Sequence, residues 1–277
     1  MTRLIVLASL VLIVAGCGGS PAKGPTILPA RTFALTKFRP ATAAVVGKPT
    51  TVSFVIRQPD GTPLTKFKTG PGPHTGVHLI IVRRDLATII HTHPPVGPGG
   101  VVSAPVTFSE PGPYKVVVDV YPATGVQPNF QLFGSLRVAG AYHPQPLGSA
   151  TTVTTEGYRF VLRGHPVLHA IEAGALTVDV SGPDGKPAVF TPWFGALAHA
   201  IFFRQGTLDY FHTHVCGATT TGCTSVLGNP KIAGSSTTPG VMKIGVLVPV
   251  PGTWRLFVQC KVAGHILTAP FTLEVKS

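Results

Sequence analysis

The chain has few charged residues and very few acids. Only 12% of its 277 residues are charged, with ten Asp or Glu against 22 Lys or Arg. The basic residues form no run of five or more and no nucleic-acid-binding motif, so the net charge of +12 does not indicate a nucleic-acid partner. It suits anionic lipid or cell-wall surroundings instead. The hydrophobic content of 44% is ample for a core, which excludes a disordered chain.

The motifs of common enzyme classes are also missing. The sequence has no Gly-x-Ser-x-Gly elbow, no phosphate-binding glycine loop and no His-Glu-x-x-His helix. A zinc hydrolase usually has a carboxylate base beside an open coordination position. Asp209 lies near His212, but its equivalent in the repeat described below is Thr88. We therefore predict that the chain is not an enzyme, with a metal-dependent enzyme as the least favoured alternative.

Methionine and cysteine are scarce. Met242 is the only Met after the first residue, which argues against a Met-rich Cu(I) site and weakens a blue-copper interpretation. Cys216 and Cys223 flank six residues and are predicted to form a disulfide, as expected for an oxidising compartment. Cys260 falls on a predicted strand, and we interpret it as a buried, inert thiol rather than a metal ligand.

The N-terminus has the pattern of a bacterial lipoprotein signal. Arg3 precedes an apolar run over residues 4–15, and small residues then lead to Cys17. This run of twelve residues is shorter than the roughly 20 that span a bilayer as a helix. We predict a signal peptide over residues 1–16, lipidation of Cys17 and a tether over residues 17–32, which would place the protein outside the cytoplasm on a membrane. The alternative is an ordinary signal peptide that happens to contain a cysteine.

The mature chain contains an internal repeat. Three anchors recur in the same order: Pro-Asp-Gly-x-Pro, then His followed by His-Thr-His, then Pro-Gly before an aromatic residue. The first two recur at offsets of about 121–124 residues and the third at 140, so the second copy carries an insertion, which holds Cys216 and Cys223. We predict a first domain over residues 33–139, a linker over 140–150 and a second domain over 151–277.

Each copy is predicted to be a series of short strands. Gly and Pro together number 60, and Val, Thr and Phe are frequent, which favours short strands joined by turns. The fold class is therefore all-β, with two tandem antiparallel β-sandwich domains of immunoglobulin-like or cupredoxin-like outline. The expected strands lie at residues 51–57, 77–83, 88–93, 114–121 and 132–138 in copy one, and 176–181, 254–262 and 267–275 in copy two.

Six histidines occupy equivalent positions in the two repeats. Strand alternation places His91 and His93 on one face, and a turn near residue 85 sets His78 across from them, so three imidazoles converge. The same geometry brings together His199, His212 and His214. His74 is an additional candidate in copy one, and His265 in copy two. His143, His165 and His169 are expected to be surface residues.

Converging imidazoles suit Cu(II) or Zn(II), and the sequence does not choose between them. We therefore predict one metal site in each repeat, on an extracytoplasmic, membrane-anchored protein that captures or buffers metal. A non-catalytic envelope module that presents loops to a protein or cell-wall partner is the alternative. In that case the histidines would be inherited structural residues, loop-bonding residues or a pH-responsive element.

The stretch Gly76-Val-His-Leu-Ile-Ile-Val-Arg through His91-Thr-His-Pro, with Pro111-Gly-Pro-Tyr later, resembles actinobacterial-type secreted and lipid-anchored proteins. These are described as heavy-metal-binding or cupredoxin-like. In copy two, Phe211-His-Thr-His and Pro251-Gly-Thr-Trp are similar to the same group. The resemblance covers most of residues 50–276 and implies export and a tandem β-sandwich fold. The Cys216–Cys223 insertion departs from the pattern, so equal metal affinity in both copies is not expected.

Overall fold

The expected strands form, and they assemble into antiparallel sheets. The computed structural model describes residues 32–70, 72–124, 129–217, 234–235 and 239–277. The predicted signal peptide, Cys17 and most of the tether lie outside the described residues, as does Cys223. Residues 32–277 form one compact unit that contains both repeats. In the described part of the chain, no helix has the length and apolar character needed to cross a membrane.

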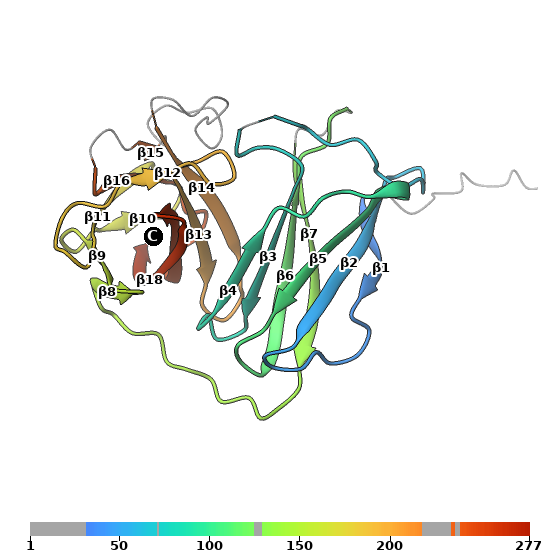
Figure 1. The fold of residues 1–277 in the computed structure, drawn as a ribbon, viewed down its shortest axis with the longest axis horizontal. Helices are drawn as coiled ribbons and strands as arrows, with labels where there is room; N and C mark the ends of the chain where they lie inside the picture. Colours follow the sequence, from blue (N-terminus) through green and yellow to red (C-terminus); the bar gives the residue numbers. More distant parts are fainter. Residues whose placement is uncertain (1–31, 71, 125–128, 218–233, 236–238) are drawn as a thin grey trace, which may run out of the picture. The chain divides into compact units, whose positions relative to one another are not determined.

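The first repeat is a sandwich of two sheets (Figure 1). One sheet has the order β1-β2-β5 and the other β4-β3-β6-β7, and a short 3-10 helix, η1 (Pro98–Gly100), precedes β5. The strands are β1 (Ala34–Arg39), β2 (Pro49–Arg57), β3 (Val77–Arg83), β4 (Ile89–Thr92), β5 (Val101–Thr107), β6 (Gly112–Val120) and β7 (Phe130–Val138).

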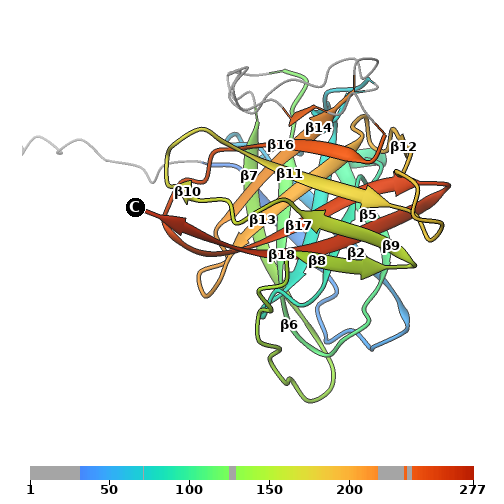
Figure 2. The same cartoon turned by 90° about the vertical axis from the view of Figure 1, so that its left-hand side faces the viewer.

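The second repeat has equivalent strands, which a short strand, β15, joins into one continuous sheet in the order β10-β18-β17-β13-β14-β15-β16-β11-β9-β8 (Figure 2). Here β13, β14, β17 and β18 correspond to β3, β4, β6 and β7. The bounds are β8 (Thr152–Thr155), β9 (Tyr158–Leu162), β10 (Leu168–His169), β11 (Gly174–Ser181), β12 (Phe190–Thr191), β13 (Ala198–Arg204), β14 (Tyr210–Cys216), β15 (Gly234–Ser235), β16 (Val241–Val246), β17 (Gly252–Val262) and β18 (His265–Lys276).

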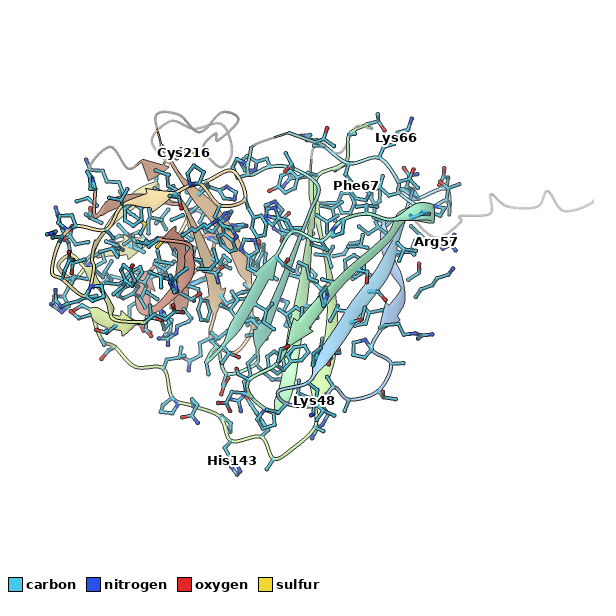
Figure 3. All side chains as sticks on the ribbon, viewed as in Figure 1. Lys48, Arg57, Lys66, Phe67, His143 and Cys216 are labelled. Carbon is cyan, nitrogen blue, oxygen red and sulfur yellow. The ribbon has the colours of Figure 1, made fainter. Side chains whose placement is uncertain are left out.

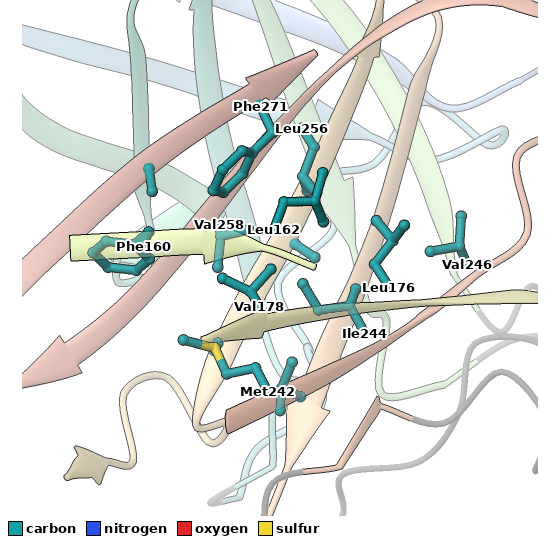
Figure 4. Close-up of a cluster of buried hydrophobic side chains, with 14 of the residues drawn as sticks. Phe160, Leu162, Leu176, Val178, Met242, Ile244, Val246, Leu256, Val258 and Phe271 are labelled. Carbon is teal, nitrogen blue, oxygen red and sulfur yellow. The ribbon is translucent and has the colours of Figure 1, made fainter. Parts of the chain in front are cut away.

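Each repeat has its own core, built by strand alternation. In copy one, Leu79 and Ile81 of β3 pack with Phe54 and Val118. In copy two, alternate residues of β17 face the interior; the cluster in Figure 4 includes Phe160, Val178, Met242, Leu256 and Phe271. Period-two alternation therefore explains one face of each central strand.

The other face of the central strands is buried as well. Every residue of β3 is buried, and so is every residue of β13 except Arg204. The residues between the core positions form a third apolar cluster that draws on both repeats: Ile80, Val82, Leu86, Val117, Ile201, Phe203, Leu208 and Phe257. The two sandwiches thus pack through the outer faces of equivalent sheets. A strand buried on both faces has a continuous apolar run rather than alternation, as Leu-Ile-Ile-Val in β3 shows.

The connection between the repeats is fixed by a buried ion pair. Residues 139–151 contain no strand, and Arg83 lies beside the first part of this segment. Its guanidinium is 1% exposed, lies 2.6 Å from Asp85 and donates to the Pro111 carbonyl. The Asp85 carboxylate in turn accepts a hydrogen bond from the Gln145 backbone N–H at 2.8 Å. Figure 3 shows His143 on this connection, away from the strands, as expected of a surface residue.

Candidate metal centre

The six repeat histidines gather in one cluster at the interface between the sandwiches. In the first repeat, His78 lies on β3, His91 on β4 and His93 directly after β4. In the second repeat, His199 lies on β13, and His212 and His214 lie on β14. All six are on the sheet faces that carry the shared apolar cluster. The register is identical in the two hairpins, with Ile80 opposite His91 and Ile201 opposite His212. His78 and His199 are completely buried, and His91, His212 and His214 are at most 8% exposed. His93 is half-buried.

This arrangement corrects the expectation of two separate sites. The hairpins do bring each trio together, but the two trios also face each other, because the outer faces of the equivalent sheets pack together. The ring centroids of His91 and His199 are 4.9 Å apart, and those of His78 and His212 are 5.5 Å apart. Of the three groups whose ring nitrogens lie within 4.8 Å of one another, two combine residues of both repeats: His78, His91 and His93; His78, His212 and His214; His91, His199 and His212.

The two additional candidates have different positions. His74 joins the cluster: its ring centroid is 4.8 Å from that of His214, and its Nδ1 lies 3.2 Å from the Tyr121 hydroxyl. His265 does not. It is exposed at the start of β18, where Nδ1 lies 2.9 Å from a carboxylate oxygen of Glu156. The prediction that loops bring it to the hairpin is wrong because His265 pairs with Val262, which points to the core face of β17 rather than to the face of Gln259 and the histidines.

The hydrogen-bonding state of His91 is set by the other repeat. His91 Nδ1 lies 3.1 Å from Gln259 Oε1, and the amide nitrogen of Gln259 donates to Thr268 Oγ1. Because the amide oxygen can only accept, His91 carries its proton on Nδ1. Its lone pair is then on Nε2, which is 3.2 Å from His93 Nε2. In metal sites, a hydrogen bond of this kind to the second ring nitrogen orients the ligating histidine.

His199 is fixed in the same way by a backbone carbonyl. Its Nε2 lies 3.0 Å from the Trp193 oxygen, so that nitrogen carries the proton and Nδ1 carries the lone pair. His199 Nδ1 is 3.2 Å from His212 Nε2. Two nitrogens bound to one tetrahedral Zn(II) at about 2.0–2.1 Å are about 3.3 Å apart. The His91–His93 and His199–His212 separations match this value.

Burial keeps the cluster neutral. Loss of hydration lowers the pKa of His78 to about 3 and that of His199 to about 4, and it lowers the pKa of His91, His212 and His214 well below the usual range. Neighbouring imidazoles add to the effect, because each would repel a second positive charge. Neutral imidazole is the form that binds metal, so the environment prepares the ligands for a cation.

One part of the cluster has ring nitrogens that bond to nothing in the described chain. Both nitrogens of His214 and Nδ1 of His212 are buried and have no hydrogen-bonding partner among the described residues. Neither nitrogen of His78 makes a hydrogen bond of normal geometry there. An unsatisfied buried polar atom costs about 1–3 kcal/mol. The cluster is therefore poorly explained as a set of structural hydrogen bonds.

A buried carboxylate stands next to these histidines. Asp119 lies opposite His78 in the β3–β6 register and is 3% exposed. Tyr121 donates to it at 3.4 Å, and burial raises the pKa of Asp119 to about 7. Gln259 holds the equivalent position in the second repeat, so the two halves of the cluster differ in charge.

Four of these neighbours are missing from the sequence-based prediction: Asp119, Trp193, Phe194 and Gln259. A signal existed for two of them, because Asp119 and Gln259 each interrupt an apolar run, Val-Val-Val-Asp-Val in β6 and Leu-Phe-Val-Gln-Cys in β17, at equivalent repeat positions. None existed for Phe194, whose ring stacks on His93 with centroids 3.9 Å apart. It belongs to a loop with no repeated motif.

Neither of the two described cysteines belongs to the groups of converging ligands. Cys216 ends β14 (Figure 3) and is disulfide-bonded, but Cys223 is outside the described residues, so their pairing stays a prediction. Cys260 is a free thiol, completely buried in the second core, and burial raises its pKa to about 12. Alternation points it away from Gln259 and the histidines, as the inert-thiol interpretation expects.

The chain belongs to the family described as "Domain of unknown function (DUF8832)", whose model matches residues 34–131 and 151–277. The first matched segment covers the first repeat up to the start of β7, the second covers the second repeat, and the residues between them include the rest of β7 and the connection. No curated protein matches the chain.

Solved structures give only distant matches. An alpha-2-macroglobulin from Salmonella is 11% identical over 91% of this chain and 15% of its own, with a TM-score of 0.27. A chimeric titin Z1Z2 is 14% identical over 90% of this chain and 100% of its own, with a TM-score of 0.23. Fibronectin(III)-like modules of Clostridium thermocellum CbhA are 10% identical over 88% and 94%, with a TM-score of 0.21. The chain thus spans a small part of the macroglobulin, and the architecture described above rests on its own strands.

Proposed function

We propose that this member of the DUF8832 family binds a transition-metal ion, Cu(II) or Zn(II), between its two repeats, as an extracytoplasmic protein held on a membrane through Cys17. One observation carries the proposal. Gln259 and the Trp193 carbonyl fix the protons of His91 and His199, so that each is left with one defined lone pair within a group of three imidazoles.

The primary ligands we assign are His91 Nε2, His199 Nδ1 and His212 Nε2. Their ring nitrogens belong to a group within 4.8 Å of one another, and the His199–His212 pair already has a ligand-like separation of 3.2 Å. His93 Nε2, 3.2 Å from His91 Nε2, is placed to be a fourth ligand. Imidazole suits Zn, Cu, Ni and Fe. Among the described residues no Cys joins the cluster and Met242 lies in the core of the second repeat, which argues against a Cu(I)-type site.

Ion entry requires an opening, because five of the seven clustered histidines are at most 8% exposed. His74 and His93 are the half-buried members. Phe194 covers His93 and has a positive φ of 48°, next to Gly195 at 78°. We propose that an ion enters beside Phe194, exchanging water for imidazole as it passes His93.

Export and anchoring support a role in capture or buffering of metal outside the cytoplasm. This part of the proposal rests on the N-terminal sequence, with its apolar run, small residues and Cys17. A fixed, buried, all-imidazole centre suits retention of an ion more than catalysis, since catalytic zinc keeps an open position for water.

The test is a titration of the full chain, purified in mild detergent and stripped with a chelator. We expect Zn(II) or Cu(II) to bind more tightly than about 10 µM, which corresponds to roughly −7 kcal/mol. The variant His199→Gln/His212→Gln should lose that affinity, whereas His169→Ala/His265→Ala, which removes two histidines outside the cluster, should keep it. Wild-type binding weaker than 10 µM for both ions would exclude the proposal.

A further inference from the structure

The cluster contains more ligand nitrogens than one ion can use. We propose that it is a binuclear centre, with a second ion held by His78, His214 and Nδ1 of His212, so that His212 bridges the two ions. This inference rests on the proposed function, which concerns the first ion alone.

The groups of converging nitrogens have the required overlap. His91, His199 and His212 form one group, His78, His212 and His214 form another, and His212 is the only residue in both. The ring centroids of His212 and His214 are 4.4 Å apart, and those of His78 and His214 are 6.1 Å apart. Since an imidazole has two ring nitrogens, one His212 ring can serve two ions on opposite sides.

The two groups of ligands differ in their hydrogen bonds. On the first side, His91 and His199 are each held by a partner that fixes one proton. On the second side, His212 Nδ1 and both nitrogens of His214 are buried without a partner among the described residues. His212 therefore has an engaged Nε2 facing His199 and an unengaged Nδ1 on its other side.

The residues next to the two groups of ligands differ in charge, and the difference favours a second cation. Gln259, next to the first group, is neutral, and its repeat equivalent Asp119 is a buried carboxyl group that lies opposite His78. Tyr121 links Asp119 to His74, whose ring is in contact with His214. A carboxylate directly across the strand pair from His78 offsets part of the charge of an ion held by neutral imidazoles.

The bridge also supplies negative charge. A neutral His212 carries one ring proton, and binding of an ion at each nitrogen displaces that proton to solvent. The bridging ring is then an imidazolate, which reduces the repulsion between the two ions. No oxidation or reduction is involved, and each ion keeps its charge.

Native mass spectrometry of the full chain, loaded with Zn(II) in detergent, tests the stoichiometry. We expect two ions in the wild type, one in His214→Gln, one in His199→Gln and two in the control His265→Ala. One ion in the wild type, unchanged in His214→Gln, would overturn the second site and leave the proposed function standing. No ion in the wild type would overturn both.

Cu(II) gives an independent readout that does not require the variants to fold. Two Cu(II) ions joined by one imidazolate couple magnetically, so the wild type should show less than half of the electron paramagnetic resonance intensity expected for its copper content. An intensity equal to the copper content at two ions per chain would overturn the bridge. In folded His214→Gln, verified by circular dichroism, the signal per copper should return to that of an isolated ion.

Discussion

Gln259 Oε1 accepts a hydrogen bond from His91 Nδ1 at 3.1 Å, across 168 positions of the chain and from one repeat to the other. The contact makes the chemistry of the first repeat depend on the second. It also fixes which His91 nitrogen is available to an ion.

Replacing Gln259 with Leu should therefore weaken metal binding without removing a ligand. We expect a loss of about 10–100-fold in Zn(II) affinity, the usual effect of removing the hydrogen-bond partner of a ligating histidine. Gln259→Glu keeps an acceptor oxygen for His91 and should retain most of the affinity. Competition with a chromophoric chelator measures both, and an affinity within twofold of wild type in Gln259→Leu would show that this bond does not orient His91.

Metal-free protein should lose stability on acidification. Burial lowers the pKa of His78 to about 3 and of His199 to about 4, from 6.5 in an unfolded chain. Between the folded-state and unfolded-state pKa values, the unfolded chain binds more protons than the folded protein. These histidines therefore leave the free energy of unfolding unchanged above about pH 6.5 and reduce it as the pH drops below that value. Each of these two histidines contributes about 1.4 kcal/mol per pH unit in this window.

Asp119 has the opposite effect on the pH dependence of stability, but the buried histidines with a lowered pKa outnumber it. Its pKa of about 7, raised from 3.8 by burial, makes its contribution decrease as the pH rises from about 4 to 7, which offsets about one histidine. Urea unfolding of chelator-treated protein at pH 7, 6 and 5 should therefore show a steady decline. A stability that is constant or rises toward pH 5 would contradict the buried, neutral state of the cluster.

The shared apolar cluster should matter to both stability and metal binding. Phe257 is 1% exposed at the interface, and its neighbour Leu256 is completely buried in the core of the second repeat, on the opposite face of β17. Phe257→Ala should cost about 3–5 kcal/mol and Leu256→Ala about 2–5 kcal/mol in free energy of unfolding. We expect only Phe257→Ala to weaken Zn(II) binding several-fold, because it loosens the packing between the two sets of ligands. Equal affinities in the two variants would show that the interface does not support the centre.

Anchoring depends on a single atom, the Cys17 sulfur, if the N-terminal prediction is correct. Cys17→Ser should move the protein from the membrane fraction to the soluble fraction and abolish incorporation of a labelled fatty acid. Cys260→Ser is the matched control, since that thiol is buried in the core. Persistence of Cys17→Ser in the membrane fraction would favour another mode of attachment.

Much of the fold follows from local pattern. The predicted strand at residues 77–83 matches β3, and the predicted Leu132–Val138 lies inside β7, which begins two residues earlier. The hairpin register that sets His78 near His91 and His93 follows from the turn position alone. The uninterrupted burial of β3 was also encoded, because Leu-Ile-Ile-Val has no polar face to turn toward water.

By itself, the sequence determined the all-β class, the repeat, the six equivalent histidines and the trio within each hairpin, since all of these depend on spacing and strand periodicity. Only the tertiary structure decided that the two trios form one cluster, that His74 joins it and that His265 does not. It also decided which imidazole protons Gln259 and Trp193 fix. The physical reason is that these contacts join residues far apart in the chain, through sheet faces whose partner no local pattern specifies.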